Sequence, residues 1–145
     1  MGGVEVIYQP KYVDITADLY GDTPINKKLV GEKLSVKVPL AEYTIANLNK
    51  AIPMSTLAGA GNTRITIGHQ AGQDAKAQAA LLYLHPIAEA GKSFDVVLYK
   101  AYVASNVTIK HDNKGERIVE VTFDALLDET RTDGNYLGLI GDSTT

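Results

Sequence analysis

Residues 32–53 constrain the fold of this chain most, because two different periodicities meet within them. Apolar and polar residues alternate over residues 33–38, which is the period of a strand with one buried face. After Pro39 the apolar residues recur at three- and four-residue steps, as on an amphipathic helix. Pro39 suits the first position of a helix, and Pro53 ends one. We therefore predict a strand that runs directly into a helix over about residues 39–52.

The N-terminal third of the sequence is predicted to form strands. Residues 4–8 and 12–16 are short β-prone runs that flank Pro10, which lacks a backbone donor. They predict either a hairpin or one interrupted strand. Residues 20–24 form a turn-like cluster, and residues 25–30 lead back towards the alternating strand.

Further strands are predicted in the C-terminal half. Residues 79–85 are apolar on both faces, which indicates a strand buried on both sides, within the domain or against another chain. Residues 94–110 and 117–127 flank a good turn and predict a long hairpin. We expect a mainly β fold, an antiparallel β-sandwich or barrel of roughly seven to nine strands with one flanking helix. Its length suits a single domain over residues 1–145.

Composition narrows the classes of function. Lys and Arg number 14 and Asp and Glu 17, and residues 116–145 alone carry a net charge of −5. A protein that wraps nucleic acid with cations would show a basic excess. Without Cys there is no disulfide, thiolate nucleophile or Cys-based metal site. The N-terminus lacks the pattern of a signal peptide, and no apolar run approaches the roughly 20 residues of a membrane span. We expect a soluble protein made in a cytoplasm.

Catalytic and ligand-binding motifs do not emerge from the sequence. His69, His85 and His111 are not paired at metal-ligand spacing, and no Gly-x-Ser-x-Gly elbow is present. Residues 59–62 lack the Lys of a phosphate loop, and the acids of residues 128–134 do not alternate as in a calcium loop. We expect no catalytic, cofactor-binding or metal site, and no enzymatic activity.

An acidic strand face and two polar segments remain. Glu120, Thr122 and Asp124 share one face of the strand over residues 117–127. That face is either an ordinary solvated surface or a negative wall past which a polyanion slides without adhering. Residues 54–62 form a long connection of small residues, which favours a functional or contact role. Residues 68–78 are polar and rich in Ala and Gln, and could hold one helical turn.

The order of several short motifs carries more information than any one of them. They are GGVEV at 2–6, ITAD at 15–18, YGDTP at 20–24, GE at 31–32, LAEYTIANL at 40–48, YLHP at 83–86, VTFDALLD at 121–128 and DGN at 133–135. This succession resembles the major tail tube proteins of long-tailed bacteriophages and of related prophage or gene-transfer particles. The resemblance extends from Gly3 to about Asp142, although members of the family generally carry further strand-forming residues ahead of the position matching Gly2.

The resemblance implies a fold and a function. The fold would be a β-sandwich or barrel with a flanking helix, related to contractile-tail tubes and to the haemolysin-coregulated protein of type VI secretion. Subunits would form homo-hexameric rings that stack into a hollow tube, in which sheets of neighbouring subunits join and through which double-stranded DNA passes without specific binding. Other partners would be the tape measure, terminator and distal tail proteins, with no membrane, and the location would be the tail of the virion.

The resemblance also suggests roles for particular residues. Glu120, Thr122 and Asp124, and with them Lys33, Ser35 and Lys37, would face water in the lumen or on the tube exterior. Contacts between subunits or rings are expected from two loops, at Met54, Leu57, Gly59, Gly61, Gln70 and Gln73. Two alternatives remain open. One is a secretion-tube ring or tail terminator protein, and the other is a small monomeric β-barrel that binds a ligand or acts as a hydrolase.

Overall fold

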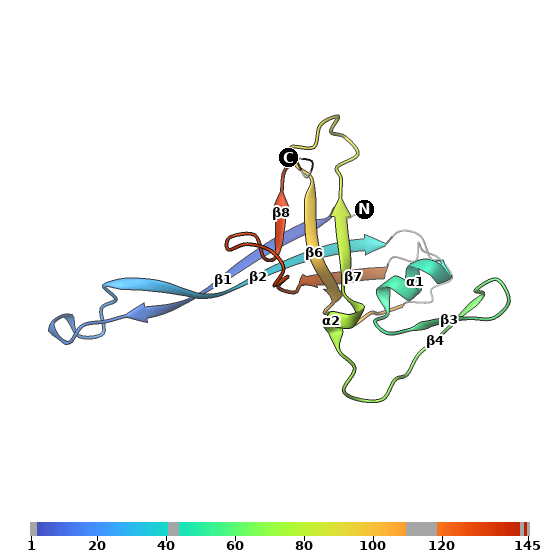
Figure 1. Cartoon of the computed structure of the whole chain (residues 1–145), viewed down its shortest axis with the longest axis horizontal. Coiled ribbons are helices and arrows are strands. Elements are labelled where there is room, and N and C mark those ends of the chain that lie inside the picture. The colour runs from blue at the N-terminus through green and yellow to red at the C-terminus, as the bar shows by residue number, and fades with distance from the viewer. Residues whose placement is uncertain (1–2, 41–43, 110–118, 143, 145) are drawn as a thin grey trace.

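A curled antiparallel sheet forms the body of the protein, and a long two-stranded arm projects from it (Figure 1). The computed structural model describes residues 3–40, 44–109, 119–142 and 144. The elements in chain order are β1 (Glu5–Ile15), the 3-10 helix η1 (Asp18–Tyr20), β2 (Asn26–Leu40), α1 (Ile45–Ala51), β3 (Thr56–Ala58), β4 (Arg64–Thr66), α2 (Ala75–Gln78), β5 (Ala80–Leu84), β6 (Val96–Val103), β7 (Val119–Ala125) and β8 (Gly138–Ile140). The prediction of a mainly β fold with a flanking helix is confirmed.

The main sheet has the strand order β1-β2-β7-β6-β5, and β8 pairs with the first half of β6. Every neighbouring pair in it is antiparallel. The strands β1 and β5 therefore lie at the two ends of this order, and β8, which pairs with β6 alone among the described strands, has a further outer edge. A separate two-stranded unit, β3–β4, extends from the other side of the body from the arm (Figure 1).

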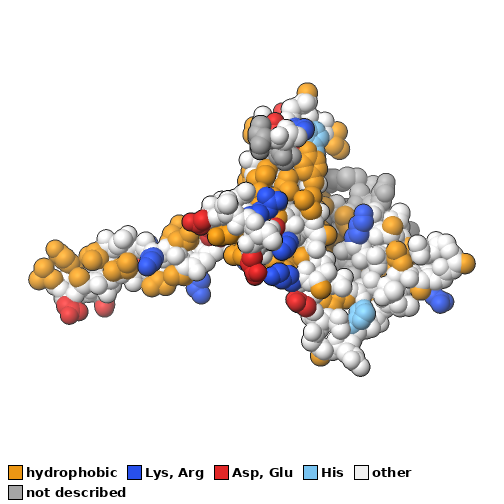
Figure 2. Space-filling view, in the orientation of Figure 1, with side chains coloured by type: hydrophobic (Ala, Val, Ile, Leu, Met, Phe, Trp, Pro, Cys, Tyr) orange, Lys and Arg blue, Asp and Glu red, His pale blue; other side chains and the backbone are white. Residues whose placement is uncertain are grey.

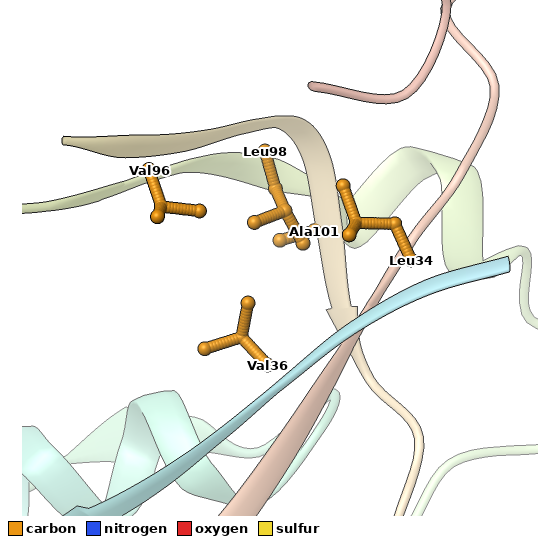
Figure 3. Packing of buried hydrophobic residues seen from close by; sticks show 5 residues of the cluster. All are labelled: Leu34, Val36, Val96, Leu98 and Ala101. Carbon is orange, nitrogen blue, oxygen red and sulfur yellow. The ribbon is translucent and has the colours of Figure 1, made fainter. Parts of the chain in front are cut away.

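Two apolar clusters hold the body together. In the first, Leu34 and Val36 of β2 face Val96, Leu98 and Ala101 of β6 across the curl of the sheet (Figure 3). In the second, α1 covers β7 through the cluster Leu48, Ala51, Val119 and Val121. Burying one such aliphatic side chain contributes roughly 1.5–3 kcal/mol. Leu34 is the first buried hydrophobic residue along the described chain, so residues 3–33 add nothing to either cluster.

The predicted helix over residues 39–52 begins too early. Pro39 and Leu40 still belong to β2, where they pair with Glu120 and Val119 of β7, because the alternation of β2 continues as long as β7 lies beside it. The helix begins only at Ile45, after Thr44, whose side chain accepts a hydrogen bond from the Asn47 backbone at 3.2 Å as an N-cap. Residues 41–43 lie outside the described part of the chain.

Several other expectations are resolved by the sheet. Residues 5–15 form one strand that passes through Pro10, which is the second of the two alternatives. Residues 54–62 are not a loop throughout, because residues 56–58 form β3 and pair with β4. The strand β5 is not buried on both faces within the domain, since Leu81 is 62% exposed. The turn predicted between β6 and β7 falls on residues 110–118, outside those described.

Candidate interaction surface

The projecting hairpin, which we call the arm (residues 5–33), has no core of its own. Every described residue from 3 to 33 is exposed except Ala17 and Gly31, which are half-buried. Figure 1 shows the distal half of the arm standing clear of the body. A two-stranded hairpin is at best marginally stable in water when it packs against nothing else. Packing within the single chain therefore contributes little to the stability of the arm.

The surface of the arm is strongly apolar (Figure 2). Of the 19 large hydrophobic residues that the described chain exposes, 12 lie between residues 4 and 30. They are Val4, Val6, Ile7, Tyr8, Tyr12, Val13, Ile15, Leu19, Tyr20, Ile25, Leu29 and Val30. Soluble monomers rarely expose a contiguous apolar patch of this kind, and such patches mark sites of contact with other molecules.

One face of the arm continues the core of the body. Directly paired residues of two strands share a face, and the register pairs Val6 with Val36, Tyr8 with Leu34 and Tyr12 with Leu29. Leu34 and Val36 are core residues, so the same apolar row that is buried in the body emerges into solvent along the arm. We call this row the tyrosine face. Tyr8 is fixed on it by donating a hydrogen bond to Glu32 at 2.6 Å.

A groove opens where the tyrosine face leaves the body. It has a volume of about 720 Å³ and lies between the arm and residues 133–140. The arm contributes Val6, Tyr8, Leu29, Glu32 and Leu34, and the opposite wall contributes Asp133, Gly134, Tyr136, Leu137, Gly138, Leu139 and Ile140. Because Leu34 and Leu137 also belong to the first core cluster, the groove is an open extension of that core.

Charges on the arm are segregated along its length. Asp18 and Asp22 lie at the tip, whereas Lys11 and Lys28 lie on the shaft, and all four are exposed. Within the arm, Asp14 and Lys27 form the one ion pair among the described residues, at 3.2 Å. The tip is therefore acidic, whereas the shaft carries charges of both signs, because Glu5 and Glu32 are also exposed on it.

A buried carboxylate fixes the free edge strand at the other side of the sheet. Asp95, fully buried at the start of β6, accepts hydrogen bonds from the hydroxyl of Tyr83 and from Nδ1 of His85, the latter at 2.6 Å. The Tyr83 bond and then the His85 bond hold the pKa of Asp95 below its ordinary value, although burial acts the opposite way. The backbone oxygen of Asp95 also accepts from Gly141 at 2.8 Å. Asp95 thereby ties β5, β6 and the segment after β8 together.

The predicted polar face of β7 is only partly at the surface. Glu120 is exposed and pairs with Lys37 at 3.2 Å, and Thr122 is half-buried. Asp124 is only 4% exposed and pairs with Lys33 at 3.1 Å, and Ser35 is also buried. The expectation that Asp124 and Ser35 face water is wrong.

The register of the sheet explains this burial. It places Ser35 and Asp124 in one row between Ile7 of β1 and Tyr102 of β6. Larger side chains therefore flank both polar residues in the middle of the sheet. The lysines of β2 neutralise the acids of β7, so this face carries paired charges and not an uncompensated negative field.

The residues predicted for contacts between subunits lie in two segments outside the main sheet, the region of the β3–β4 hairpin and the connection from β4 to α2. Leu57 is in β3, and Gly59 and Gly61 are in the turn to β4 with positive φ angles of 88° and 75°. Met54 precedes this hairpin, whereas Gln70 and Gln73 are exposed in the connection from β4 to α2. Sequence reasoning missed the arm as a contact surface. The signal for it was the apolar character of both faces of residues 4–16.

Comparison with known proteins adds no family. No protein-family model matches this chain, and no curated protein sequence matches it. Within the described ranges, no group of three or more His, Asp or Glu side chains is arranged to hold a metal ion. Neither helix of that part of the chain has the length and apolar character needed to cross a membrane.

Proposed function

We propose that this chain is a structural, non-enzymatic subunit of a bacteriophage tail tube. Homo-hexameric rings of it would stack into a hollow conduit for DNA ejection in the tail of the virion. The tape measure, terminator and distal tail proteins would be its other partners. The ordered motifs of the sequence support this proposal through their resemblance to the tail tube family, and the mainly β fold agrees with it.

The observation that carries the proposal is the excess surface of the single chain. A compact monomer of this mass is expected to have about 7,250 Å² of accessible surface. The chain has 10446 Å², an excess of about 3,200 Å² over that expectation. Obligate assemblies bury roughly 2,000–5,000 Å² per interface. The excess therefore has the size that permanent assembly would remove.

The arm supports a second copy of the chain as the partner. Its tip carries Asp18 and Asp22, and Lys11 and Lys28 on its shaft have the opposite charge. Tip and shaft are at different distances along the same extended hairpin, so they meet between arms of different copies. The contact would place the apolar surfaces of two arms together, and the charges would set their direction and register.

The two free edges of the sheet support closure into a ring. Unpaired edge strands are an aggregation hazard, and joining them in a closed ring removes it. Because β1 and β5 lie at opposite edges, the contact between copies would be head-to-tail, which is the kind of contact that forms rings. In such a ring the paired charges Lys37–Glu120 and Lys33–Asp124 leave few unpaired cations on the adjoining sheet face to hold phosphates.

Electron microscopy of the purified chain, together with a shortened arm, tests the proposal. The variant replaces residues 10–32 by Asn-Gly, which closes a two-residue hairpin between Gln9 and Lys33, residues already paired in the register. Since the buried apolar core begins at Leu34, the body should keep its fold by circular dichroism. We expect tubes from the parent chain and only folded monomers from the variant. Tubes from both would contradict the role given to the arm.

A charge exchange provides the matched control. Replacing Asp18 and Asp22 by Lys should prevent tube formation because tip and shaft then repel each other. Adding Lys11→Asp and Lys28→Asp to the same chain should restore tubes. The lysines at the tip would then face aspartates on the shaft of another copy. If the four-fold variant stays monomeric while the two-fold variant assembles, the arms do not meet in this way.

A second candidate function is favoured by the groove. Its volume of about 720 Å³ is within the range of small-molecule sites, so a monomeric β-barrel that binds an apolar ligand is the competing proposal. A stable monomer by sedimentation that binds a hydrophobic dye in the groove would favour it. Discrete single rings in place of long tubes would favour a secretion-tube ring or a tail terminator.

A further inference from the structure

The outer edge of β1 poses a problem that the proposed assembly must solve. This edge is 11 residues long and has no neighbouring strand within the described chain. The side chains on both faces of the strand are exposed and largely apolar. A long, exposed, apolar edge strand is a template for open-ended pairing with other strands. A subunit that accumulates before it assembles needs a block against such pairing.

Pro10 lies near the middle of this edge and has no backbone N–H to offer an incoming strand. The proline does not interrupt the pairing of β1 with β2. The register continues through it from Gln9–Lys33 to Pro10–Glu32 and Lys11–Gly31. Proline is tolerated in sheets at edges, where the missing donor faces away from the neighbouring strand. The missing donor therefore weakens pairing with an incoming strand and not the pairing with β2.

A register shift directly beyond the proline adds a second obstacle. It lies between Lys11 and Tyr12, where the opposite strand has one extra residue, Val30. Such bulges bend and twist a strand, which makes its edge a poorer template. Lys11 is exposed beside the shift and adds a charge. Three features that oppose edge pairing thus lie within three consecutive residues.

We propose that Pro10 is a specificity-determining residue that blocks strand addition along the arm. It restricts uninterrupted pairing along this edge to the short stretches on either side of it, residues 5–9 and 12–15, and directs the arm to contact its partner through a face, such as the tyrosine face. The choice of face over edge rests on the proposed function, in which a second copy meets the arm. The block itself does not depend on that function.

The test compares Pro10→Thr with Gln9→Thr in the full chain. Both changes introduce a residue with high β propensity at neighbouring positions of one exposed strand, but only Pro10→Thr restores a backbone donor. Agitated samples are followed by thioflavin T fluorescence, by fibre diffraction for the strand spacing of about 4.7 Å, and by electron microscopy. The concentration that remains soluble at the end measures the stability of the fibres.

We expect Pro10→Thr to form cross-β fibres and Gln9→Thr to behave as the parent chain. The residual soluble concentration should fall about fivefold for Pro10→Thr, which corresponds to one net hydrogen bond per added strand. Equal behaviour of the two variants, whether both soluble or both fibrous, would overturn the inference. A parent chain that forms no tubes alongside a fibrous Pro10→Thr variant would remove the proposed function and leave the block in place.

Discussion

Gly138→Ala should displace β8 from the sheet. A Cβ atom at Gly138 would lie 2.3 Å from the backbone oxygen of Val97 and 3.2 Å from Cδ2 of Leu34. Real Cβ atoms essentially never approach another atom more closely than 3.0 Å, and the backbone oxygen cannot rotate away as a side chain could. The strand itself must therefore move, and with it the wall of the groove that residues 137–140 form.

The size of the effect follows from two contributions. Overpacking of a fitted site costs about 1–3 kcal/mol. Displacement of β8 also weakens the backbone hydrogen bonds around it, such as Tyr99 to Leu137 at 3.2 Å and Gly141 to Asp95 at 2.8 Å, each with a net value of about 1 kcal/mol. We expect the free energy of unfolding to fall by about 3 kcal/mol in total. For a domain of this size, that corresponds to a melting temperature lower by roughly 6–12 °C.

Urea and thermal unfolding followed by circular dichroism measure this change, with Gly91→Ala as the matched control. A Cβ atom at Gly91 would meet no atom within 4 Å. The control should therefore unfold within about 1 kcal/mol of the parent chain, on the stable side if the lost backbone freedom of the unfolded state dominates. If Gly138→Ala proves as stable as Gly91→Ala, the close approach of β8 to β6 is not a feature of the folded protein.

Two further predictions concern charged residues. The hydrogen bond from Thr130, followed by that from Lys100, lowers the pKa of Asp128 to about 2. This carboxylate therefore stabilises the fold above its ordinary pKa and loses that effect as the pH falls from about 4 to about 2. Urea midpoints across this range should fall more steeply for the parent chain than for Asp128→Asn, and equal slopes would refute the assignment. Lys33→Met leaves the buried Asp124 without its cation and should lower the free energy of unfolding by roughly 1–2 kcal/mol, after allowance for the exposure of Lys33. Lys37→Met, beside the exposed Glu120, should lower it by at most about 0.5 kcal/mol. A double-mutant cycle by chemical unfolding separates the two contributions.

Periodicity was a sound guide wherever one face of an element is buried by the body. The alternation of Leu34 and Val36 predicted the strand that supplies half of the first core cluster. It failed at Pro39, because a proline at the first position of a helix and a proline in a strand that is ending look alike in sequence. The presence of β7 opposite Pro39 decides the matter, and that is a tertiary contact.

The arm shows why the candidate surface was harder to predict than the fold. Residues 4–16 are apolar on both faces, a pattern that a strand buried in the body would also show. Only the arrangement in space reveals that the hairpin stands away from the body. The prediction that Asp124 faces water failed for the opposite reason. An acid in an alternating strand usually faces water, whereas Asp124 is buried. It lies between Ser35 and Tyr102 in the register of the sheet, and both come from distant parts of the chain.

The lack of a core in the arm has a kinetic consequence. A hairpin that is only marginally stable alone loses much of its conformational entropy when it docks. In the proposed tube, the first contact between two subunits would therefore carry an ordering cost that a rigid surface would not have. A subunit arriving at an existing end would meet arms that are already ordered, and more of its surface would be covered at once. Growth from an end would therefore be fast and spontaneous initiation slow. Tubes should then form from the purified chain only after a lag, and added tube ends should shorten that lag.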